Sequence, residues 1–89
     1  MNEDVVSIPI EGTLDLHTFD PKDVGDLLPE YLEQCRNRGI KEVKIIHGKG
    51  TGALKAVVLA RLGKITFVES AADAGYADGG WGATIVRLK

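Results

Sequence analysis

The sequence predicts one small α/β domain in which strands and helices alternate in the order β-α-β-α-β-β. The chain has 89 residues, which is too few for two separate hydrophobic cores. Its 44% hydrophobic and 27% charged residues are ordinary for a folded globular chain, and they exclude wholesale disorder or a collagen-like repeat. Strand-like and helix-like hydrophobic patterns alternate along it, which implies parallel strands joined by right-handed crossovers.

Two strand-like segments open the chain. Residues 5–10 are short and β-prone, and Pro9 marks them as an edge strand or an extended arm. We therefore expect residues 1–11 to form an N-terminal arm or an extra edge strand. Residues 13–17 alternate between polar and apolar side chains, which is the pattern of a half-buried strand.

The first helix follows the turn signal Asp20-Pro21. Pro29 would break the interior of a helix that began at Pro21, so we predict a start near Gly25 or Asp26. Gly39 is a suitable residue to end this helix. Apolar side chains recur at three- and four-residue spacing and predict its buried face: Val24, Leu27, Leu28, Tyr31, Leu32 and Cys35.

The remaining elements are shorter. Residues 43–46 read as a strand, residues 47–52 as a loop, and residues 51–62 as a second helix that ends at Gly63. A third strand is predicted at residues 65–69. A loop of small residues then fills 70–81, and a β-rich last strand covers 83–88.

The net charge of −2 conceals a strong asymmetry along the chain. Residues 1–35 hold nine acidic side chains and one basic, a charge of −8. Residues 36–64 hold eight basic and one acidic, a charge of +7, and residues 65–89 hold three acidic and two basic, a charge of −1. The basic segment makes an anionic partner such as nucleic acid compatible with the acidic total. The alternative is that acidic and basic surfaces face each other across the fold.

The sequence predicts neither a membrane span nor a signal peptide. No apolar stretch is long enough to span a membrane, and the acidic first residues lack the basic and then apolar pattern of a signal peptide. A single cysteine, Cys35, excludes an internal disulfide. We therefore expect a cytoplasmic protein without a membrane partner.

The first candidate site is Leu-Asp-Leu-His at residues 14–17. Alternation along a strand places Leu14 and Leu16 on one face, and Asp15 and His17 on the other. A carboxylate and an imidazole two residues apart can hold a metal ion together. They can also form an acid/base pair in which Asp15 orients the ring of His17. The alternative is a surface strand whose polar face has no chemical role.

The second candidate site is the loop His-Gly-Lys-Gly-Thr-Gly at residues 47–52. Its glycines allow close approach of the backbone to a ligand, and the N-terminus of the following helix favours an anion. Lys49 adds positive charge, and Thr51 can cap the helix or bind a phosphate. The loop lacks the Walker A pattern.

A nucleotide or small phosphate ligand is an alternative for this loop. Residues 48–53 formally match the dinucleotide-binding pattern Gly-x-Gly-x-x-Ala, and Glu69 ends the next predicted strand. Against this stand the position of the loop after the second strand and the short chain that remains. A glycine loop that only turns the chain is a further alternative.

The third candidate site is Gly80-Trp81-Gly82, which leads into the last strand. Trp81 can stack on a base or a sugar, or it can cover the edge of the core. Ligands of α/β sheets bind beyond the carboxyl ends of the parallel strands, where His17 and His47 stand. If the last strand runs antiparallel, its start borders the same cleft.

These three stretches, completed by Gly-Gly-Trp-Gly-Ala-Thr-Ile-Val at residues 79–86, resemble the Smr (small MutS-related) domain family. The resemblance covers about residues 12–89, which we expect to form the Smr-like domain, and it is to stand-alone bacterial members. It implies a two-layer α/β sandwich with a mixed four-stranded sheet, similar to the C-terminal domain of translation initiation factor three.

The resemblance also implies a nucleic-acid-directed function. One possibility is a weak, metal-assisted nicking endonuclease that acts on DNA or RNA with Mg²⁺ or Mn²⁺ and no organic cofactor. The other is a non-catalytic nucleic-acid- or ribosome-binding module that uses the same cleft. The family usually has glycine after the histidine of the first motif, whereas Thr18 stands here, so we expect a stiffer first loop.

Residue patterns and resemblance together nominate three sets of site residues. The expected catalytic residues are Asp15, His17 and His47, and the expected metal ligands are Asp15 and His17. The residues expected to bind nucleic acid or phosphate are Gly48, Lys49, Gly50, Thr51, Gly52, Gly80, Trp81 and Gly82.

Overall fold

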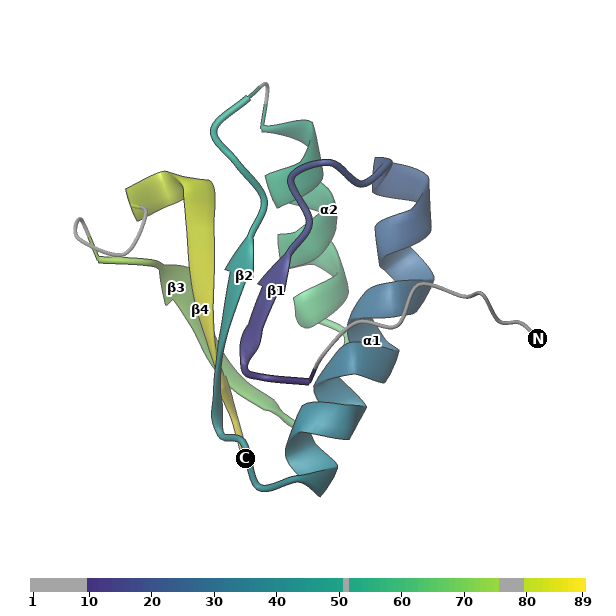
Figure 1. Cartoon of the computed structure of the whole chain (residues 1–89), viewed down its shortest axis with the longest axis vertical. Coiled ribbons are helices and arrows are strands. Elements are labelled where there is room, and N and C mark those ends of the chain that lie inside the picture. Colours follow the sequence, from purple (N-terminus) through teal and green to yellow (C-terminus); the bar gives the residue numbers. More distant parts are fainter. Residues whose placement is uncertain (1–9, 51, 76–79) are drawn as a thin grey trace.

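Four strands form one mixed sheet in the order β1-β2-β4-β3, seen in a computed structural model that describes residues 10–50, 52–75 and 80–89 (Figure 1). β1 and β2 are parallel, and β4 runs antiparallel to both β2 and β3. The predicted mixed four-stranded sheet is therefore confirmed. The strands are β1 (Thr13–Asp15), β2 (Glu42–Ile46), β3 (Val68–Asp73) and β4 (Ala83–Leu88).

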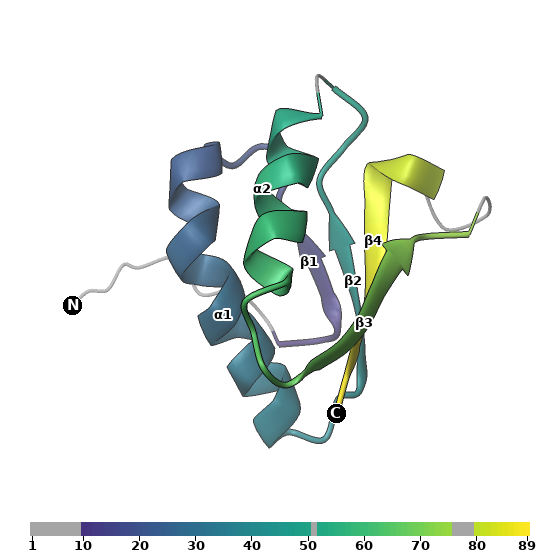
Figure 2. The same ribbon diagram turned by 180° about the vertical axis from the view of Figure 1, so that it is seen from behind.

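Two helices cover one face of this sheet, which gives the predicted two layers (Figures 1 and 2). They are α1 (Pro21–Asn37) and α2 (Ala53–Leu62). Within the described ranges, neither is long and apolar enough to cross a membrane. The core between the layers contains Leu14, Leu16, Val24, Leu28, Tyr31, Leu32, Cys35, Val43, Ile45, Val58, Leu62, Val86 and Leu88.

Helix α1 begins four or five residues earlier than the sequence predicts, at Pro21 rather than at Gly25 or Asp26. Pro21 suits the first turn because its missing N–H would have no partner there. Pro29 lies inside the helix, where proline costs about 3 kcal/mol. Buried side chains on both sides of Pro29 pack against the sheet and α2, and this tertiary packing outweighs the local cost. The helix ends before Gly39, which has φ 77°, as expected.

Strand β3 corrects the prediction for residues 65–69, because it spans Val68–Asp73. The predicted loop over 70–81 therefore starts only after Asp73. The prediction was wrong because β3 is an edge strand with almost no buried side chain, so it lacks the hydrophobic alternation that marks a strand. Pairing with β4, which includes a register shift between Val68 and Ser70, defines this strand instead.

Two further boundaries differ slightly from expectation. β1 ends at Asp15 rather than at residue 17, although the backbone N–H of Leu16 still donates to the carbonyl of Ile46 over 2.7 Å. α2 begins at Ala53. The expected N-terminal arm, apart from its last two residues, and Thr51 lie outside the described residues.

Candidate functional site

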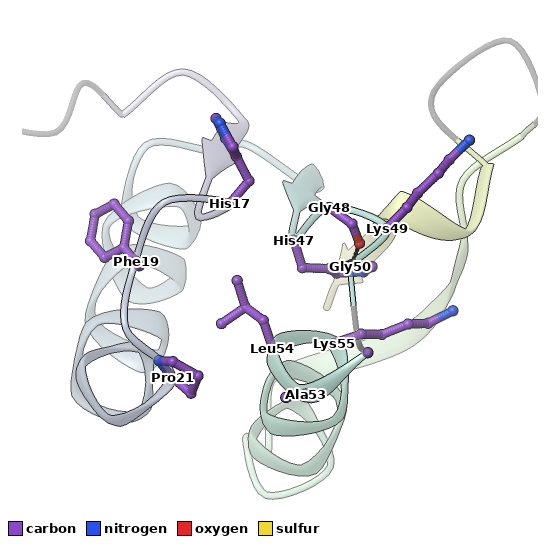
Figure 3. Close-up of a pocket in the computed structure, with 11 residues that line it drawn as sticks. His17, Phe19, Pro21, His47, Gly48, Lys49, Gly50, Ala53, Leu54 and Lys55 are labelled. Atoms are coloured by element: carbon purple, nitrogen blue, oxygen red, sulfur yellow. Dashed lines mark hydrogen bonds between the residues drawn. The ribbon is translucent and has the colours of Figure 1, made fainter.

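A pocket of about 360 Å³ opens where β1 and β2 end, between the two loops that follow these strands (Figure 3). His17, Phe19 and Pro21 line one side. Residues 47–50 and the start of α2 line the other. The pocket thus lies at the carboxyl ends of two adjacent parallel strands, and both histidines of the chain line it.

The start of β4 borders the same edge of the sheet, as the sequence predicts for an antiparallel last strand. Asp15 pairs with Ile46, and Ile46 pairs with Ala83, so the three strands are aligned at this edge. The carbonyl oxygen of Gly82 accepts hydrogen bonds from the backbone N–H groups of His47 (3.0 Å) and Gly48 (2.9 Å). The 3₁₀ turn Gly80–Gly82 is therefore attached to the glycine loop. The side chain of Trp81 is outside the described part of the chain.

Gly82 also supports the lysine of the glycine loop. A Cβ atom added at Gly82 would stand 2.9 Å from Cγ of Lys49, which is too close. The stem of Lys49 thus passes close to the backbone of Gly82, where a larger residue would displace it. The ligand contact predicted for Gly82 stays a prediction.

Asp15 and His17 form a hydrogen-bonded pair on the exposed side of the sheet edge. One carboxylate oxygen, Oδ1 of Asp15, accepts a hydrogen bond from Nδ1–H of His17 (2.5 Å) and another from its backbone N–H (3.0 Å). These two bonds, the ring bond first, lower the pKa of Asp15. A carboxylate only accepts hydrogen bonds, so Nδ1 carries a proton and Nε2 is the ring nitrogen left to exchange one. The side chains are 50% and 57% exposed, so a large substrate can reach them.

The local backbone explains this arrangement. Leu16, fully buried, fixes the strand between Asp15 and His17. The N–H of Phe19 donates to the carbonyl of Leu16 over 2.9 Å and closes a turn directly after the pair. Neighbouring side chains of one strand point to opposite faces, so anchoring Leu16 in the core turns Asp15 and His17 outward together.

This geometry does not fit Asp15 and His17 as joint ligands of the expected Mg²⁺ or Mn²⁺. In this arrangement the Asp15 carboxylate faces Nδ1 of the ring and Nε2 is directed away from it, so the two side chains do not converge on one ion. Across residues 10–50, 52–75 and 80–89, no group of three or more His, Cys, Asp or Glu side chains could hold a metal. The pair fits the other sequence-based reading, in which a carboxylate orients an imidazole for proton transfer.

His47 is buried, with 4% of its surface exposed. Its Nδ1–H donates to the carbonyl of Gly48 (3.3 Å), and its Nε2 accepts from the hydroxyl of Thr84 (2.8 Å), which is also buried. Burial lowers the pKa of His47 and outweighs the opposing hydrogen bond to Gly48. Both ring nitrogens are thus committed to the protein. The catalytic role predicted for His47 stays a prediction, and the contacts favour a positioning role for the glycine loop.

Replacing His47 by glutamine should change how stability depends on pH. Because the folded-state pKa of His47 lies below its unfolded value of about 6.5, the unfolded state binds more protons as pH falls below that value. The free energy of unfolding of the parent therefore decreases as pH decreases from 7.5 to 5. His47→Gln lacks this titrating group and does not show that decrease. Urea unfolding at both pH values should show a smaller difference between parent and variant at pH 5. An unchanged difference would mean that His47 is not held neutral.

The glycine loop leaves part of its backbone open to a ligand. Gly48 and Gly52 have φ values of 84° and 88°, which favour glycine. Gly48 was expected to bind phosphate, but its backbone N–H already donates to the carbonyl of Gly82. Among the described residues, the N–H groups of Lys49, Gly50 and Gly52 have no protein partner. Sequence reasoning missed Lys55, which lines the pocket and pairs with Asp73 of β3 over 2.8 Å.

The dinucleotide-binding alternative is wrong on topology. In that pattern an acidic residue ends the strand that lies next to the glycine loop. Here β4 separates β2 from β3, and Glu69 lies near the start of β3, at the end of the sheet opposite the loop.

Known proteins that are similar to this chain identify its family. The family model of the Smr domain matches residues 14–89. Proteins named Endonuclease MutS2 from Finegoldia magna and Clostridium kluyveri are 39% and 38% identical to this chain over 80 residues, which is 90% of this chain and 10% of each relative. The chain therefore spans about a tenth of the length of these curated relatives.

Two solved structures share the fold. The Smr domain of Thermus thermophilus MutS2 superposes with a TM-score of 0.84 at 34% identity and covers 89% of this chain and 99% of that one. YdaL, a stand-alone small MutS-related protein from Escherichia coli, superposes with a TM-score of 0.83 at 24% identity, over 97% of this chain and 70% of that one. Because the family match spans most of the sequence and the fold agrees with that of a crystallised Smr domain, this chain belongs to the Smr domain family.

Proposed function

We propose that this domain is an endonuclease that nicks phosphodiester bonds in DNA or RNA. The observation that carries the proposal is the exposed Asp15–His17 pair, which stands beside a glycine loop suited to an anion. The name of the relatives, Endonuclease MutS2, supports the same reaction class.

The glycine loop would hold the phosphate. The N–H groups of Lys49, Gly50 and Gly52 are the donors that the described backbone leaves open, and the Lys49 ammonium supplies positive charge. Donors of this kind stabilise the charge that develops on the phosphoryl oxygens during cleavage. Gly48 contributes differently. A Cβ at Gly48 would stand 3.5 Å from Cβ of His17, so the loop packs directly against the residue that bears the ring.

His17 would move the proton. Its Nε2 accepts a proton from a water molecule while the water oxygen bonds to phosphorus, and the bond from phosphorus to the leaving oxygen breaks. The proton then passes to the leaving oxygen, so that the ring returns to its starting state. Asp15 holds the ring in the required tautomer and stabilises the imidazolium that forms in between. Asp15 is thus a positioning residue and His17 the catalytic one.

A binding module without cleavage is the second candidate. It is favoured by the high exposure of the Asp15–His17 pair, because water is not excluded from the proposed reaction centre. Highly purified protein incubated with supercoiled plasmid and with a single-stranded RNA, in Mg²⁺ and in Mn²⁺, distinguishes the two. Nicking by the parent supports the endonuclease. Binding of the same substrates without any cleavage supports the module.

Lys49→Ala should weaken nucleic-acid binding for all sequences alike, because a phosphate contact carries no base information. Loss of one contact should reduce the slope of log affinity against log salt concentration by about 0.7 to 0.9. Lys41→Ala is the matched control, since Lys41 is also exposed but precedes β2, at the opposite end of the sheet. Titrations at several salt concentrations measure both slopes. The same slope in Lys49→Ala and in the parent would remove Lys49 from the phosphate path.

A further inference from the structure

The pocket has an apolar side that the phosphate loop and the Asp15–His17 pair do not use. Phe19 and Pro21 line it from the loop after β1, and Leu54 lines it from the first turn of α2. All three are half-buried. Figure 3 shows Leu54 extending from α2 into the space between the two loops, toward the side that carries Phe19 and Pro21. A charged phosphate group does not bind favourably to such an apolar surface.

The opposite side of the pocket combines the backbone of the glycine loop with the side chains of His47, Lys49 and Lys55. A Cβ atom added at Gly50 or at Gly52 would meet nothing within 4 Å, so the space beside the loop is open. The cavity volume of about 360 Å³ lies within the range of about 300–1,000 Å³ that is usual for small organic ligands. The space is thus larger than a phosphate group requires. It is bounded by apolar side chains on one side, and by polar backbone and basic side chains on the other.

These features match the chemistry of a nucleobase. A base has two apolar faces that stack on aromatic and aliphatic side chains, and polar edges that bond to backbone groups. The adjoining Lys49 and loop N–H groups suit the phosphate that every nucleotide carries. The pocket and the loop together therefore offer separate surfaces for the two ends of one nucleotide.

We propose that this pocket receives the base of a single unpaired nucleotide, so that the domain acts on single-stranded or locally unpaired nucleic acid. The inference rests on the proposed function and names its substrate class. A base inside a duplex is stacked and paired, and it reaches a pocket only after leaving the stack. Insertion of the base beside Phe19 and Leu54 would place the adjoining phosphate at the loop, next to His17.

The test compares oligonucleotides that differ only in their bases. Fluorescence anisotropy measures binding of a 12-nucleotide single strand, of a strand of the same length whose every nucleotide is abasic, and of the corresponding duplex. The first two carry the same phosphate charge, so any difference between them comes from the bases. Stacking of one base changes affinity by about 5- to 150-fold, so we expect the normal strand to bind at least fivefold more tightly than the abasic strand. The duplex should also bind more weakly than the normal single strand.

Two variants locate the base contact. Leu54→Ala and Phe19→Ala should weaken binding of the normal strand and leave binding of the abasic strand unchanged. Leu59→Ala, on the same helix with 42% of its surface exposed and outside the pocket lining, is the matched control for Leu54 and should change neither. Thermal unfolding checks that each variant is folded. The comparison of strands uses the unmodified protein, so it stands even if Phe19→Ala does not fold.

The outcomes separate this inference from the proposed function. Equal binding of normal and abasic strands, with Lys49→Ala still weakening both, would overturn the base pocket and keep the phosphate loop. Tighter binding of the normal strand that neither Leu54→Ala nor Phe19→Ala affects would also overturn it, since the base contact would lie elsewhere. Failure of the parent to bind any of the three ligands would overturn the proposed function itself.

Discussion

Asp15→Asn should reduce nicking of supercoiled plasmid by about 10²- to 10⁴-fold, the usual contribution of a positioned acid/base group. Asparagine preserves the shape of the side chain but removes the charge that stabilises a His17 imidazolium, and its amide can present a donor to Nδ1 in place of an acceptor. Nucleic-acid affinity should barely change, because a lone carboxylate does not attract phosphate. Nicking rates and binding curves measured on the same preparations separate the two effects.

Asp20→Asn is the matched control for this substitution. Asp20 is an exposed carboxylate on the loop that follows Asp15, and it precedes α1 without making a side-chain cap hydrogen bond. It should therefore nick plasmid at the parental rate. Cleavage that persists undiminished in Asp15→Asn would remove Asp15 from the reaction and would point to a contaminating nuclease or another centre.

Leu16→Ala should have the largest effect on stability near the site, a loss of about 2–5 kcal/mol in the free energy of unfolding. Leu16 is fully buried in the core between the sheet and the helices, and truncation leaves a cavity there. His17→Ala, one residue later but 57% exposed, should change stability by no more than about 0.5 kcal/mol. Urea unfolding of both variants gives the comparison.

This contrast tests whether burial decides how much two consecutive residues contribute to stability. Leu59→Ala, an exposed leucine on α2, controls for removal of a leucine side chain as such. Similar losses for Leu16→Ala and His17→Ala would mean that the segment directly after β1 does not place these two side chains on opposite faces of the sheet.

Much of the fold could be predicted from hydrophobic periodicity, because most elements have one buried face. Val43 and Ile45 of β2 are buried in alternation, and the apolar face of α1 packs on the core as expected. The bounds of β3 were not predicted because pairing with β4, rather than burial, defines this strand. The start of α1 was not predicted because tertiary packing around Pro29 outweighs the usual cost of proline inside a helix.

The site was predictable where it depends on strand geometry alone. The common face of Asp15 and His17 follows from alternation, and their convergence with His47 and Gly82 follows from strand order. The choice between a metal pair and an acid/base pair depends on side-chain torsion angles, which a sequence pattern does not carry. The sequence also treats both histidines alike. Burial and the hydroxyl of Thr84, 37 residues away, separate them.

The central claim is that Asp15 and His17 act as one catalytic unit, and a double-mutant cycle of nicking rates tests it most directly. The four proteins are the parent, Asp15→Asn, His17→Ala and the double variant, purified in parallel and assayed on one plasmid substrate. Residues that act as a unit are strongly non-additive, so the double variant should be about as slow as His17→Ala alone. Losses that multiply in the double variant, or equal nicking by all four proteins, would contradict the claim.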